Sequence, residues 1–340
     1  MRSETSIWVS SILASGQRRA IPILASPGAL LAGLAPGRVY RSGAWQYACL
    51  EALAKRFPAD VMVTFMDLSL EAEAFGCGIA FSDHEIPTVS GAVASDGAAI
   101  DRLRVPEVGE GRTGEALDCA RRSAAGLGRP VFGGMIGPFS LAGRLADMTE
   151  IMVLAASEPE LAHALLDKAA AFLTVYAQAI QATGVAGLVI AEPAAGLLSP
   201  AMCKAFATPY LQRIIAPLKR PGFTVVLHNC GNTRDQVSQL LAAGPDALHV
   251  GNAVDILDIL RQVPPDVPVM GNVDPVGVLA HASPETVYAA TSDLLRRTSA
   301  YPNFALSTGC DVPAATPAAN LDAFFNACRD YNHNPTRAAR

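Results

Sequence analysis

Three residues of metal-binding type stand at two places in the chain. His228 and Cys230 are separated by one residue, and Cys310 follows much later. Residues two apart in an extended segment point to the same side, so His228 and Cys230 can bind one ion together. With Cys310 as a third ligand, one imidazole and two thiolates form a typical zinc set that leaves a fourth position open for substrate. A lone His-x-Cys is more often a strand end with a buried thiol, and this alternative stays open.

An open zinc site with these ligands has two chemical uses. Zinc can bind a substrate thiol, which loses its proton and becomes a nucleophile at neutral pH. Zinc can also activate a water molecule for hydrolysis. A ligand set rich in thiolates lowers the Lewis acidity of zinc relative to a set rich in histidine, and we therefore expect alkylation of a thiol.

Seven short apolar runs alternate with longer segments of helical periodicity. Strands that alternate with helices are typical of βαβ units and a parallel sheet. The chain has no glycine-rich dinucleotide loop, so the pattern predicts an α/β fold of the (β/α)8 or TIM barrel type rather than an open doubly wound sheet. An eighth strand is not evident from the pattern. The seven runs are 61–66, 130–136, 187–191, 223–227, 247–250, 267–270 and 304–307.

Polar residues gather just after these runs. In a (β/α)8 barrel the carboxyl ends of the strands form one rim, and that rim holds the active site. We therefore expect Glu192, Asn272 and Asp274 to take part in catalysis, and Asp67 and Asn252 to contact a cofactor. Asp67 also fits an N-terminal cap of the next helix, because acidic residues follow it at the spacing of a capping motif.

Two residues close to the metal-binding positions have two interpretations each. His249 lies inside a predicted strand, where a histidine is usually a hydrogen-bonded core residue but can orient a metal ligand. Asp311 follows Cys310 and is either a partner of that ligand or a turn residue. The remaining thiols have no histidine or cysteine at ligand spacing and are expected in the core, at Cys49, Cys77, Cys119, Cys203 and Cys328.

The composition excludes several classes of protein. The 340 residues are 51% hydrophobic and only 17% charged, which is enough apolar material for a large core. The net charge of −5 argues against nucleic acid or an acidic membrane surface as the main partner. The apolar stretches are too short for a membrane span. The N-terminus lacks a basic region followed by a long apolar core, so we expect a cytoplasmic protein without a signal peptide.

The domain organisation follows from length and pattern. We expect one barrel domain over residues 1–340, with an N-terminal extension and an insertion around residues 82–111 that is poor in strands. Helical periodicity is clearest over 161–182, 235–243 and 284–299. The last of these has Ser283 as its expected N-terminal cap and Pro284 in its first turn.

Several stretches in this order resemble one family. They match the zinc-dependent methylcobamide:coenzyme M methyltransferases, which fall within the uroporphyrinogen decarboxylase superfamily. The similarity runs from about residue 40 to residue 330. The stretches are Met66-Asp-Leu-Ser-Leu-Glu-Ala-Glu-Ala-Phe-Gly76, Gly137-Pro-Phe-Ser-Leu-Ala-Gly-Arg144, His228-Asn-Cys-Gly-Asn-Thr233, Gly271-Asn-Val-Asp-Pro275 and Ser307-Thr-Gly-Cys-Asp-Val-Pro313.

The resemblance implies a barrel enzyme that transfers a methyl group. The donor would be a methylated corrinoid, either methylcobalamin or a corrinoid carrier protein, and the acceptor a small thiol such as coenzyme M or homocysteine. His228, Cys230 and Cys310 match the family's Zn²⁺ ligands. The barrel accounts for the whole length and leaves no corrinoid-binding domain, so a separate carrier protein is expected as partner. The oligomeric state stays open.

The sequence departs from the family at one position of interest. Gly251 and Asn252 stand where an acidic residue is often found after the fifth strand. If that residue is a fourth zinc ligand in the resting enzyme, then Asp274, Glu192 or a water molecule must replace it here.

Two alternative functions remain. The first is decarboxylation of a porphyrinogen, as in the other branch of the superfamily, which needs no metal and holds its substrate with an arginine-rich N-terminal motif. The N-terminal arginines of this chain do not follow that motif's pattern; they are Arg18, Arg19, Arg38 and Arg41. The second alternative is a non-catalytic protein that binds a corrinoid or tetrapyrrole on the same barrel.

Overall fold

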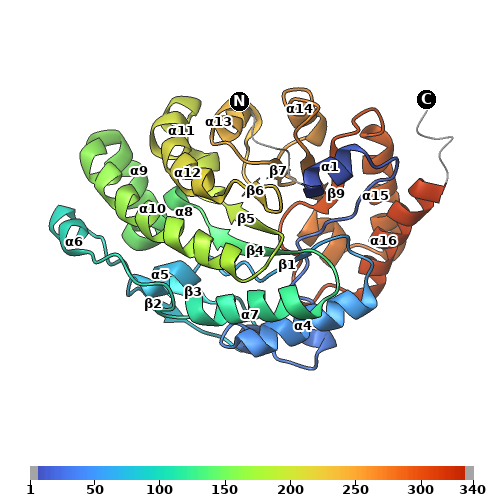
Figure 1. The fold of residues 1–340 in the computed structure, drawn as a ribbon, viewed down its shortest axis with the longest axis horizontal. Helices are drawn as coiled ribbons and strands as arrows, with labels where there is room; N and C mark the ends of the chain where they lie inside the picture. Colours follow the sequence, from blue (N-terminus) through green and yellow to red (C-terminus); the bar gives the residue numbers. More distant parts are fainter. Residues whose placement is uncertain (1–6, 334–340) are drawn as a thin grey trace.

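A computed structural model describes residues 7–333, which form an α/β barrel around a curled parallel sheet (Figure 1). The seven strands pair in the order β1-β4-β5-β6-β7-β8-β9, and every pair is parallel. The predicted fold class is confirmed, and each of the seven apolar runs overlaps one strand. The strands are β1 (Met62–Val63), β4 (Val131–Ile136), β5 (Gly187–Ala191), β6 (Thr224–Asn229), β7 (Ala247–Val250), β8 (Val269–Val273) and β9 (Phe304–Thr308).

Residues 20–24 close the barrel between β9 and β1. The Ile21 N–H donates to the carbonyl of Leu306 at 2.8 Å, and on the other side Asp60 N–H donates to the carbonyl of Ala20 at 2.9 Å. This segment therefore occupies the eighth strand position, inside what the sequence indicates only as an N-terminal extension. It carries a proline, Pro22, which has no N–H to donate and limits the ladder of hydrogen bonds.

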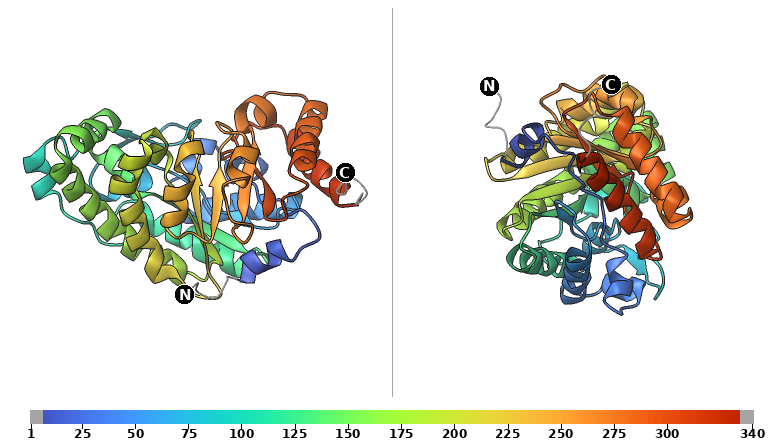
Figure 2. Two further views of the ribbon diagram at one scale, coloured as in Figure 1. Left: turned by 90° about the horizontal axis from the view of Figure 1, so that it is seen from above. Right: turned by 90° about the vertical axis from the view of Figure 1, so that its right-hand side faces the viewer.

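Helices surround the sheet on its outer side, as Figures 1 and 2 show. The longest, α10, covers the whole predicted helix 161–182, and Ser283 caps α15 through the Thr286 N–H as expected. The helices of the outer ring are α2 (Gly28–Leu31), α3 (Pro36–Val39), α4 (Gly43–Arg56), α5 (Leu70–Ala74), α7 (Thr113–Gly126), α8 (Pro138–Ala146), α9 (Met148–Ser157), α10 (Pro159–Ala182), α11 (Pro200–Phe206), α12 (Thr208–Ile215), α13 (Val237–Ala242), α14 (Ile256–Leu260), α15 (Pro284–Arg297) and α16 (Ala318–His333). Short turns of helix are η1 (Pro193–Leu197), η2 (Ala216–Leu218), η3 (Arg234–Gln236) and η4 (Pro275–Ala280).

Apolar side chains fill the barrel interior, and helix α1 closes one end of it. We call the end formed by the amino ends of the strands the base, and the end formed by their carboxyl ends the mouth. The N-terminal helix α1 (Ile7–Leu13) places Trp8 against Phe132, with ring centroids 5.0 Å apart, and buries Ile12 in the same cluster. The closing segment contributes Ile21 and Ile23 to that cluster. The strands, with Val61 just before β1, contribute Val61, Val63, Phe132, Val189, Val226, Ala247, Met270 and Ala305.

The insertion at residues 82–111, which we call the arm, is packed against the barrel. It contains the strand β3 (Thr88–Ser90), paired with β2 (Gly78–Ala80), and the helix α6 (Gly97–Arg102). The Lys168 ammonium on α10 donates to the carbonyls of Ile100, Asp101 and Leu103, at 2.6–2.8 Å. A cation is favourable at a helix C-terminus, so this contact fixes α6 at the far end of the molecule in Figure 2.

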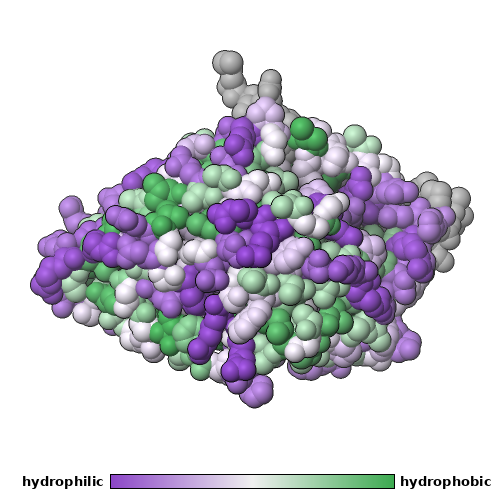
Figure 3. All heavy atoms as spheres, turned by 60° about the horizontal axis from the view of Figure 1, so that its bottom comes forward, coloured by the Kyte–Doolittle hydropathy of each residue, from purple (hydrophilic) through white to green (hydrophobic). Residues whose placement is uncertain are grey.

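The outer surface mixes polar and apolar side chains. Figure 3 shows hydrophobic residues in separate patches among hydrophilic ones on the face that it displays. Within residues 7–333 no helix is long and apolar enough to cross a bilayer.

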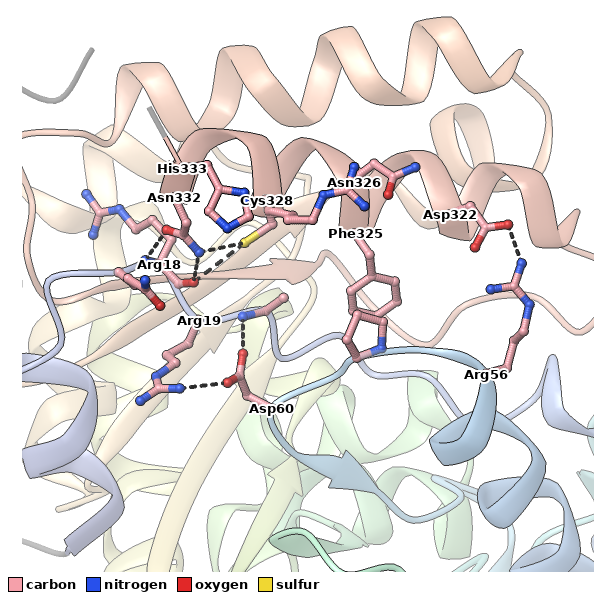
Figure 4. A pocket seen from close by; sticks show the side chains of 14 residues that line it. Arg18, Arg19, Arg56, Asp60, Asp322, Phe325, Asn326, Cys328, Asn332 and His333 are labelled. Atoms are coloured by element: carbon pink, nitrogen blue, oxygen red, sulfur yellow. Dashed lines mark hydrogen bonds and ion pairs between the residues drawn. The ribbon is translucent and has the colours of Figure 1, made fainter. Parts of the chain in front are cut away.

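A cavity of about 420 Å³ lies near the base, between α16, α4 and residues 17–20 (Figure 4). The Arg18 guanidinium donates to four carbonyls, those of Thr298 and Ser299 after α15 and those of Tyr301 and Phe304 before and in β9, at 2.7–3.1 Å. Arg19 pairs with Asp60 at 2.9 Å. These arginines therefore hold the closing segment in place.

We expect Arg18→Met to destabilise the protein by about 2–4 kcal/mol, because four carbonyls lose a charged donor at the point of closure. The measurement is the free energy of unfolding in urea. The matched control is Arg329→Met, which removes an exposed arginine paired with Asp330 and is expected to change stability by less than about 0.5 kcal/mol. Equal effects of the two substitutions would contradict this role for Arg18.

Candidate metal centre

The inner face of the barrel changes from apolar to polar toward the mouth. Val226, Ala247 and Ala305 belong to the interior cluster, and the residues two positions later on the same strands are His228, His249 and Ser307. Side chains two apart on a strand share a face, so these three polar groups also point inward. His228 and His249 stand directly opposite each other in the pairing of β6 with β7. The sequence alternation thus builds one polar layer above the core.

His228, Cys230 and Cys310 converge at the mouth as expected. One ligand atom from each lies within 4.8 Å of the other two, and His228 Nε2 is 3.8 Å from Cys310 Sγ. Zinc bonds of about 2.0–2.3 Å in a tetrahedral site place a nitrogen and a sulfur ligand roughly 3.6 Å apart. The spacing and the donor types of the three residues therefore fit a zinc ion. Neither Asp274 nor Glu192 belongs to this group, so a fourth side open to substrate or water fits better than a carboxylate ligand.

The two cysteines of this group share one environment. A hydrogen bond from Cys310, and a second contact from His228, lower the pKa of Cys230 well below its usual range. The same pairing, together with burial, raises the pKa of Cys310. The pair therefore releases its first proton readily, and thiolate is the form that binds metal. By contrast the other five cysteines are buried outside the group, in line with the expectation of core thiols.

A chain of hydrogen bonds orients the His228 ring. The Ser307 hydroxyl donates to the Ile21 carbonyl at 2.7 Å, so its oxygen accepts from His249 Nε2–H at 2.8 Å. Burial, with a further contribution from the neighbouring His228, lowers the pKa of His249 well below its usual value, and its ring is neutral. The free Nδ1 of His249 therefore accepts from His228 Nδ1–H at 2.8 Å. This leaves the lone pair of His228 on Nε2, which faces Cys310.

Two glycines let the ligand loops approach one another. A Cβ on Gly251 would lie 2.5 Å from the Cα of Cys230, and a Cβ on Gly309 would lie 2.6 Å from Oδ1 of Asn252. The loops after β6, β7 and β9 are thus stacked against each other at positions where only glycine fits. The glycine at 251 is required by the backbone of Cys230.

Glu192 is a buried partner of helix α8. Its Oε2 accepts from Phe139 N–H at 2.9 Å, and its Oε1 accepts from Ser140 N–H at 2.7 Å and from the Ser140 hydroxyl. Burial raises the pKa of this carboxyl to about 7, and the hydrogen bonds from Ser140 and Phe139 partly offset that effect. Both oxygens are engaged at the start of α8, which gives Glu192 a structural role. Its expected part in catalysis stays a prediction without support from these contacts.

Three other expected site residues lie near the carboxyl ends of β7 and β8: Asn252 after β7, Asn272 within β8 and Asp274 directly after it. Asn272 donates through Nδ2 to the carbonyls of Gly251 and Val254, at 3.0 and 2.9 Å, and so holds the loop after β7. Asp274 accepts from two backbone N–H groups at the start of η4, at 2.9 Å each. Asn252 is exposed and lies against Gly309. Their catalytic or cofactor-binding roles stay predictions.

Asp67 lies in a buried ionic group below the arm. Arg112 donates to Asp67 Oδ2 and, at 2.6 Å, to Glu73 Oε2. Asp67 Oδ1 accepts from Ser69 N–H at 2.9 Å, as expected for a cap of the turn before α5. These contacts favour the capping alternative, and contact with a cofactor stays a prediction. Glu71 is buried beside this group, and burial raises the pKa of its carboxyl to about 8.

Asp311 binds the segment that follows the eighth strand position. Its Oδ2 accepts from the Ser26 hydroxyl at 2.8 Å, and Ser26 Oγ lies 3.1 Å from the hydroxyl of Tyr40. Burial raises the pKa of Asp311 to about 6. Its Oδ1 is buried and accepts no hydrogen bond from the described residues. Asp311 is therefore a partly buried carboxylate, hydrogen-bonded next to a candidate ligand, rather than a simple turn residue.

Sequence reasoning missed the roles of Ser307, Gly251 and Gly309. The signal for Ser307 is its inward position two residues after Ala305, in the same layer as His228 and His249. The glycines carry no such signal, because the clash that a Cβ would cause depends on how the loops meet in space.

The fold is a (β/α)8 barrel that carries a candidate metal-binding group at its mouth, and comparison with known proteins gives the family. The model of the uroporphyrinogen decarboxylase (URO-D) family matches residues 45–331. The chain belongs to the uroporphyrinogen decarboxylase family. The resemblance found in the sequence is thereby confirmed.

The similar proteins include methyltransferases and uroporphyrinogen decarboxylases. The methylcobamide:CoM methyltransferase MtbA of Methanosarcina acetivorans is 32% identical over 272 residues, which cover 78% of each chain. A uroporphyrinogen decarboxylase of Xanthomonas axonopodis pv. citri is 31% identical over 71% of this chain and 70% of its own length. A methyltransferase structure from Methanosarcina mazei superposes with a TM-score of 0.84 at 21% identity, covering 94% of this chain and 97% of that one, which supports the fold.

We expect Gly251→Ala to weaken metal binding by at least about tenfold, because the new Cβ forces the backbone of Cys230 to shift. The measurement is competitive zinc titration against a chelator. Gly222→Ala is the control, since a Cβ there meets no atom within 4 Å. Unchanged zinc affinity in a folded Gly251→Ala protein would show that the close contact does not set the ligand position.

We expect His249→Phe to lower zinc affinity about 10–100-fold, because His228 Nδ1–H loses its acceptor and the ring its orientation. The same titration measures the effect, and the visible spectrum of the Co²⁺-loaded protein reports the change in ligand geometry. His163→Phe is the control, because that ring stacks on Phe206 and is not in the metal-binding group. A Co²⁺ spectrum and affinity identical to those of the unmodified protein would rule out orientation by His249.

Proposed function

We propose that this chain is a zinc-dependent methyltransferase that moves a methyl group from a methylated corrinoid to a thiol. The observation that carries the proposal is the group of His228, Cys230 and Cys310, with ligand atoms within 4.8 Å of one another at the barrel mouth. The name of the relative MtbA, which specifies a methylcobamide donor and coenzyme M as acceptor, supports the same reaction class.

The residues of the site suit the binding of a thiol beside two thiolates. His228, Cys230 and Cys310 would hold zinc through Nε2 and the two sulfurs, and zinc in such a site supplies acidification of a coordinated thiol. The hydrogen bonds from Ile21 to His228 keep the ligand nitrogen unprotonated and aimed at the site. No general base among the described residues is required, because zinc would lower the pKa of the bound thiol enough for its proton to pass to solvent.

The transfer itself is a displacement at carbon. The thiolate sulfur of the acceptor forms a bond to the methyl carbon while the cobalt–carbon bond breaks. Both electrons of that bond stay on cobalt, so methyl-Co(III) becomes Co(I) and the thiolate becomes a methyl thioether. The barrel core below His228 excludes water from the rear of the site, which favours the displacement over side reactions.

The partners follow from this reaction. A corrinoid carrier protein would present the methyl group at the mouth, and coenzyme M or homocysteine are the candidate acceptors. We place the enzyme in the cytoplasm, where free thiols stay reduced.

The decarboxylase alternative has the names of several relatives in its favour. A substrate with many carboxylates needs cations at the mouth. Of the N-terminal arginines, Arg18 and Arg19 are bound to carbonyls and to Asp60 at the base. Arg38 pairs with Asp83 at 3.5 Å, and Arg41 lies over the ring of Phe81. The zinc-type ligands and the placement of these arginines favour methyl transfer.

We expect the purified protein to hold about one zinc ion per chain and to demethylate methylcobalamin when a thiol is present. In Cys310→Ala both properties are lost, with the rate of demethylation reduced by more than about 100-fold. Elemental analysis measures the metal, and the visible absorbance change of the cobalamin measures the reaction.

The control for this substitution is Cys203→Ala, which removes a buried thiol outside the metal-binding group and should keep metal and activity. A Cys310→Ala protein with full activity would overturn the proposal. So would a metal-free protein that decarboxylates uroporphyrinogen without any effect of added zinc.

A further inference from the structure

Four loops beside the metal-binding group form a continuous part of the barrel rim. They follow β5, β6, β7 and β8, which are neighbours in the sheet, at the carboxyl ends that make up the mouth. Adjacent strands lie about 4.8 Å apart, so these loops stand side by side. We call them the arc, which comprises residues 193–199, 230–233, 251–254 and 275–278.

The arc is in contact with both loops that carry the metal ligands. Cys230 is itself the first residue of the second loop of the arc. A Cβ on Gly251 would lie 2.5 Å from the Cα of Cys230. A Cβ on Gly309, the residue before Cys310, would lie 2.6 Å from Oδ1 of Asn252. A large molecule that reaches the metal-binding group from the mouth therefore meets the arc.

The arc is a neutral surface. Apart from the metal-binding Cys230, none of its residues is ionisable, although 17% of the whole chain is charged. Charged residues that flank it are already engaged: Arg234 and Asp255 form ion pairs with residues of other segments, and Asp274 accepts two backbone N–H groups at the start of η4. The arc therefore offers no cation to a substrate with many carboxylates, such as a uroporphyrinogen.

The exposed side chains of the arc are of two kinds. Leu197 and Val276 are aliphatic and are 62% and 50% exposed. Asn232 and Asn252 are primary amides at the surface. Among the described residues the Asn252 amide has no hydrogen-bond partner, and Asn232 only accepts, from the Arg234 N–H at 3.4 Å. Because the loops follow neighbouring strands in order, two amides with free N–H donors stand between two aliphatic side chains.

A large neutral molecule with apolar groups and amides on its edge matches this surface. The corrin ring has this chemistry, because its edge carries methyl groups and primary carboxamides. We propose that the arc binds the corrin ring of the methyl donor. Leu197 and Val276 pack against its methyl groups, where burial of apolar surface is favourable. Asn232 and Asn252 form hydrogen bonds with its carboxamides.

The proposal rests on the proposed function, because that function supplies the corrinoid donor. It adds that the ring itself is recognised by side chains of this chain, whether the ring arrives as free methylcobalamin or on a carrier protein. Recognition of the ring does not require the nucleotide tail of the cobalamin.

The test measures binding in the absence of methyl transfer. Methylcobalamin is titrated into the purified protein without any thiol, and calorimetry gives the Kd. We expect Leu197→Ser and Asn252→Ala each to raise the Kd at least about fivefold, because an apolar contact or amide hydrogen bonds are lost. The zinc content should not change. When a thiol is added, the KM for methylcobalamin should rise in parallel with the Kd.

The matched controls are Val153→Ser and Asn326→Ala. Val153 is an aliphatic residue of α9 that is 50% exposed, and Asn326 lines the cavity near the base. Each control removes the same kind of group at a place outside the arc and should leave the Kd unchanged. Methylcobinamide, which has the ring and its amides but no nucleotide tail, should lose affinity for the arc variants by the same factor as methylcobalamin.

The outcomes distinguish this proposal from the proposed function. An unchanged Kd in both arc variants, or binding of methylcobalamin but not of methylcobinamide, would overturn the assignment of the arc even if a thiol is methylated. Absence of methylcobalamin binding to the unmodified protein would overturn it as well. Weaker binding by the arc variants alone, without demethylation when a thiol is present, would support the arc and count against the proposed function.

Discussion

A line of three hydrogen bonds, from the Ile21 carbonyl through Ser307 and His249 to His228, couples the candidate metal centre to the closure of the barrel. The carbonyl at its start belongs to the segment that fills the eighth strand position. If that segment moved away from β9, Ser307 would lose its acceptor and the His228 ring its defined orientation. The chemistry at the mouth therefore depends on the same contact that completes the sheet.

The curvature of the sheet is the second condition for the site. The strands β6 and β9 are separated in the sheet by β7 and β8. His228 lies in β6, and Cys230 and Cys310 follow β6 and β9. In a flat sheet a strand-to-strand spacing of about 4.8 Å would keep Cys310 more than about 14 Å from His228. The curl of the barrel brings their ligand atoms within 4.8 Å. The curvature that closes the sheet is therefore also what brings the three ligand side chains together.

The sequence predicts most of this arrangement, and the exceptions have physical causes. The strand runs and the three ligands follow from alternation and residue type, which are local properties. The closing strand escapes detection because it is short and contains Pro22. Glu192 and Asp67 stand at strand ends, where the sequence predicts site residues. Their carboxylates bind the starts of nearby helical turns, and their predicted site roles stay predictions. Glycine is needed at 251 and 309 because the loops approach each other closely there. The distance between loops depends on the tertiary structure and cannot be read from a single sequence.

Helix α1 restricts how molecules can reach the candidate metal centre. With Trp8 and Ile12 seated against the barrel core, the base is sealed, and the metal-binding group can be reached from the mouth side only. Under the proposed function, a bulky methyl donor and a small acceptor would use this one entrance in turn. The small thiol would then have to enter first, because the donor covers the mouth, and the methylated product would leave only after the donor.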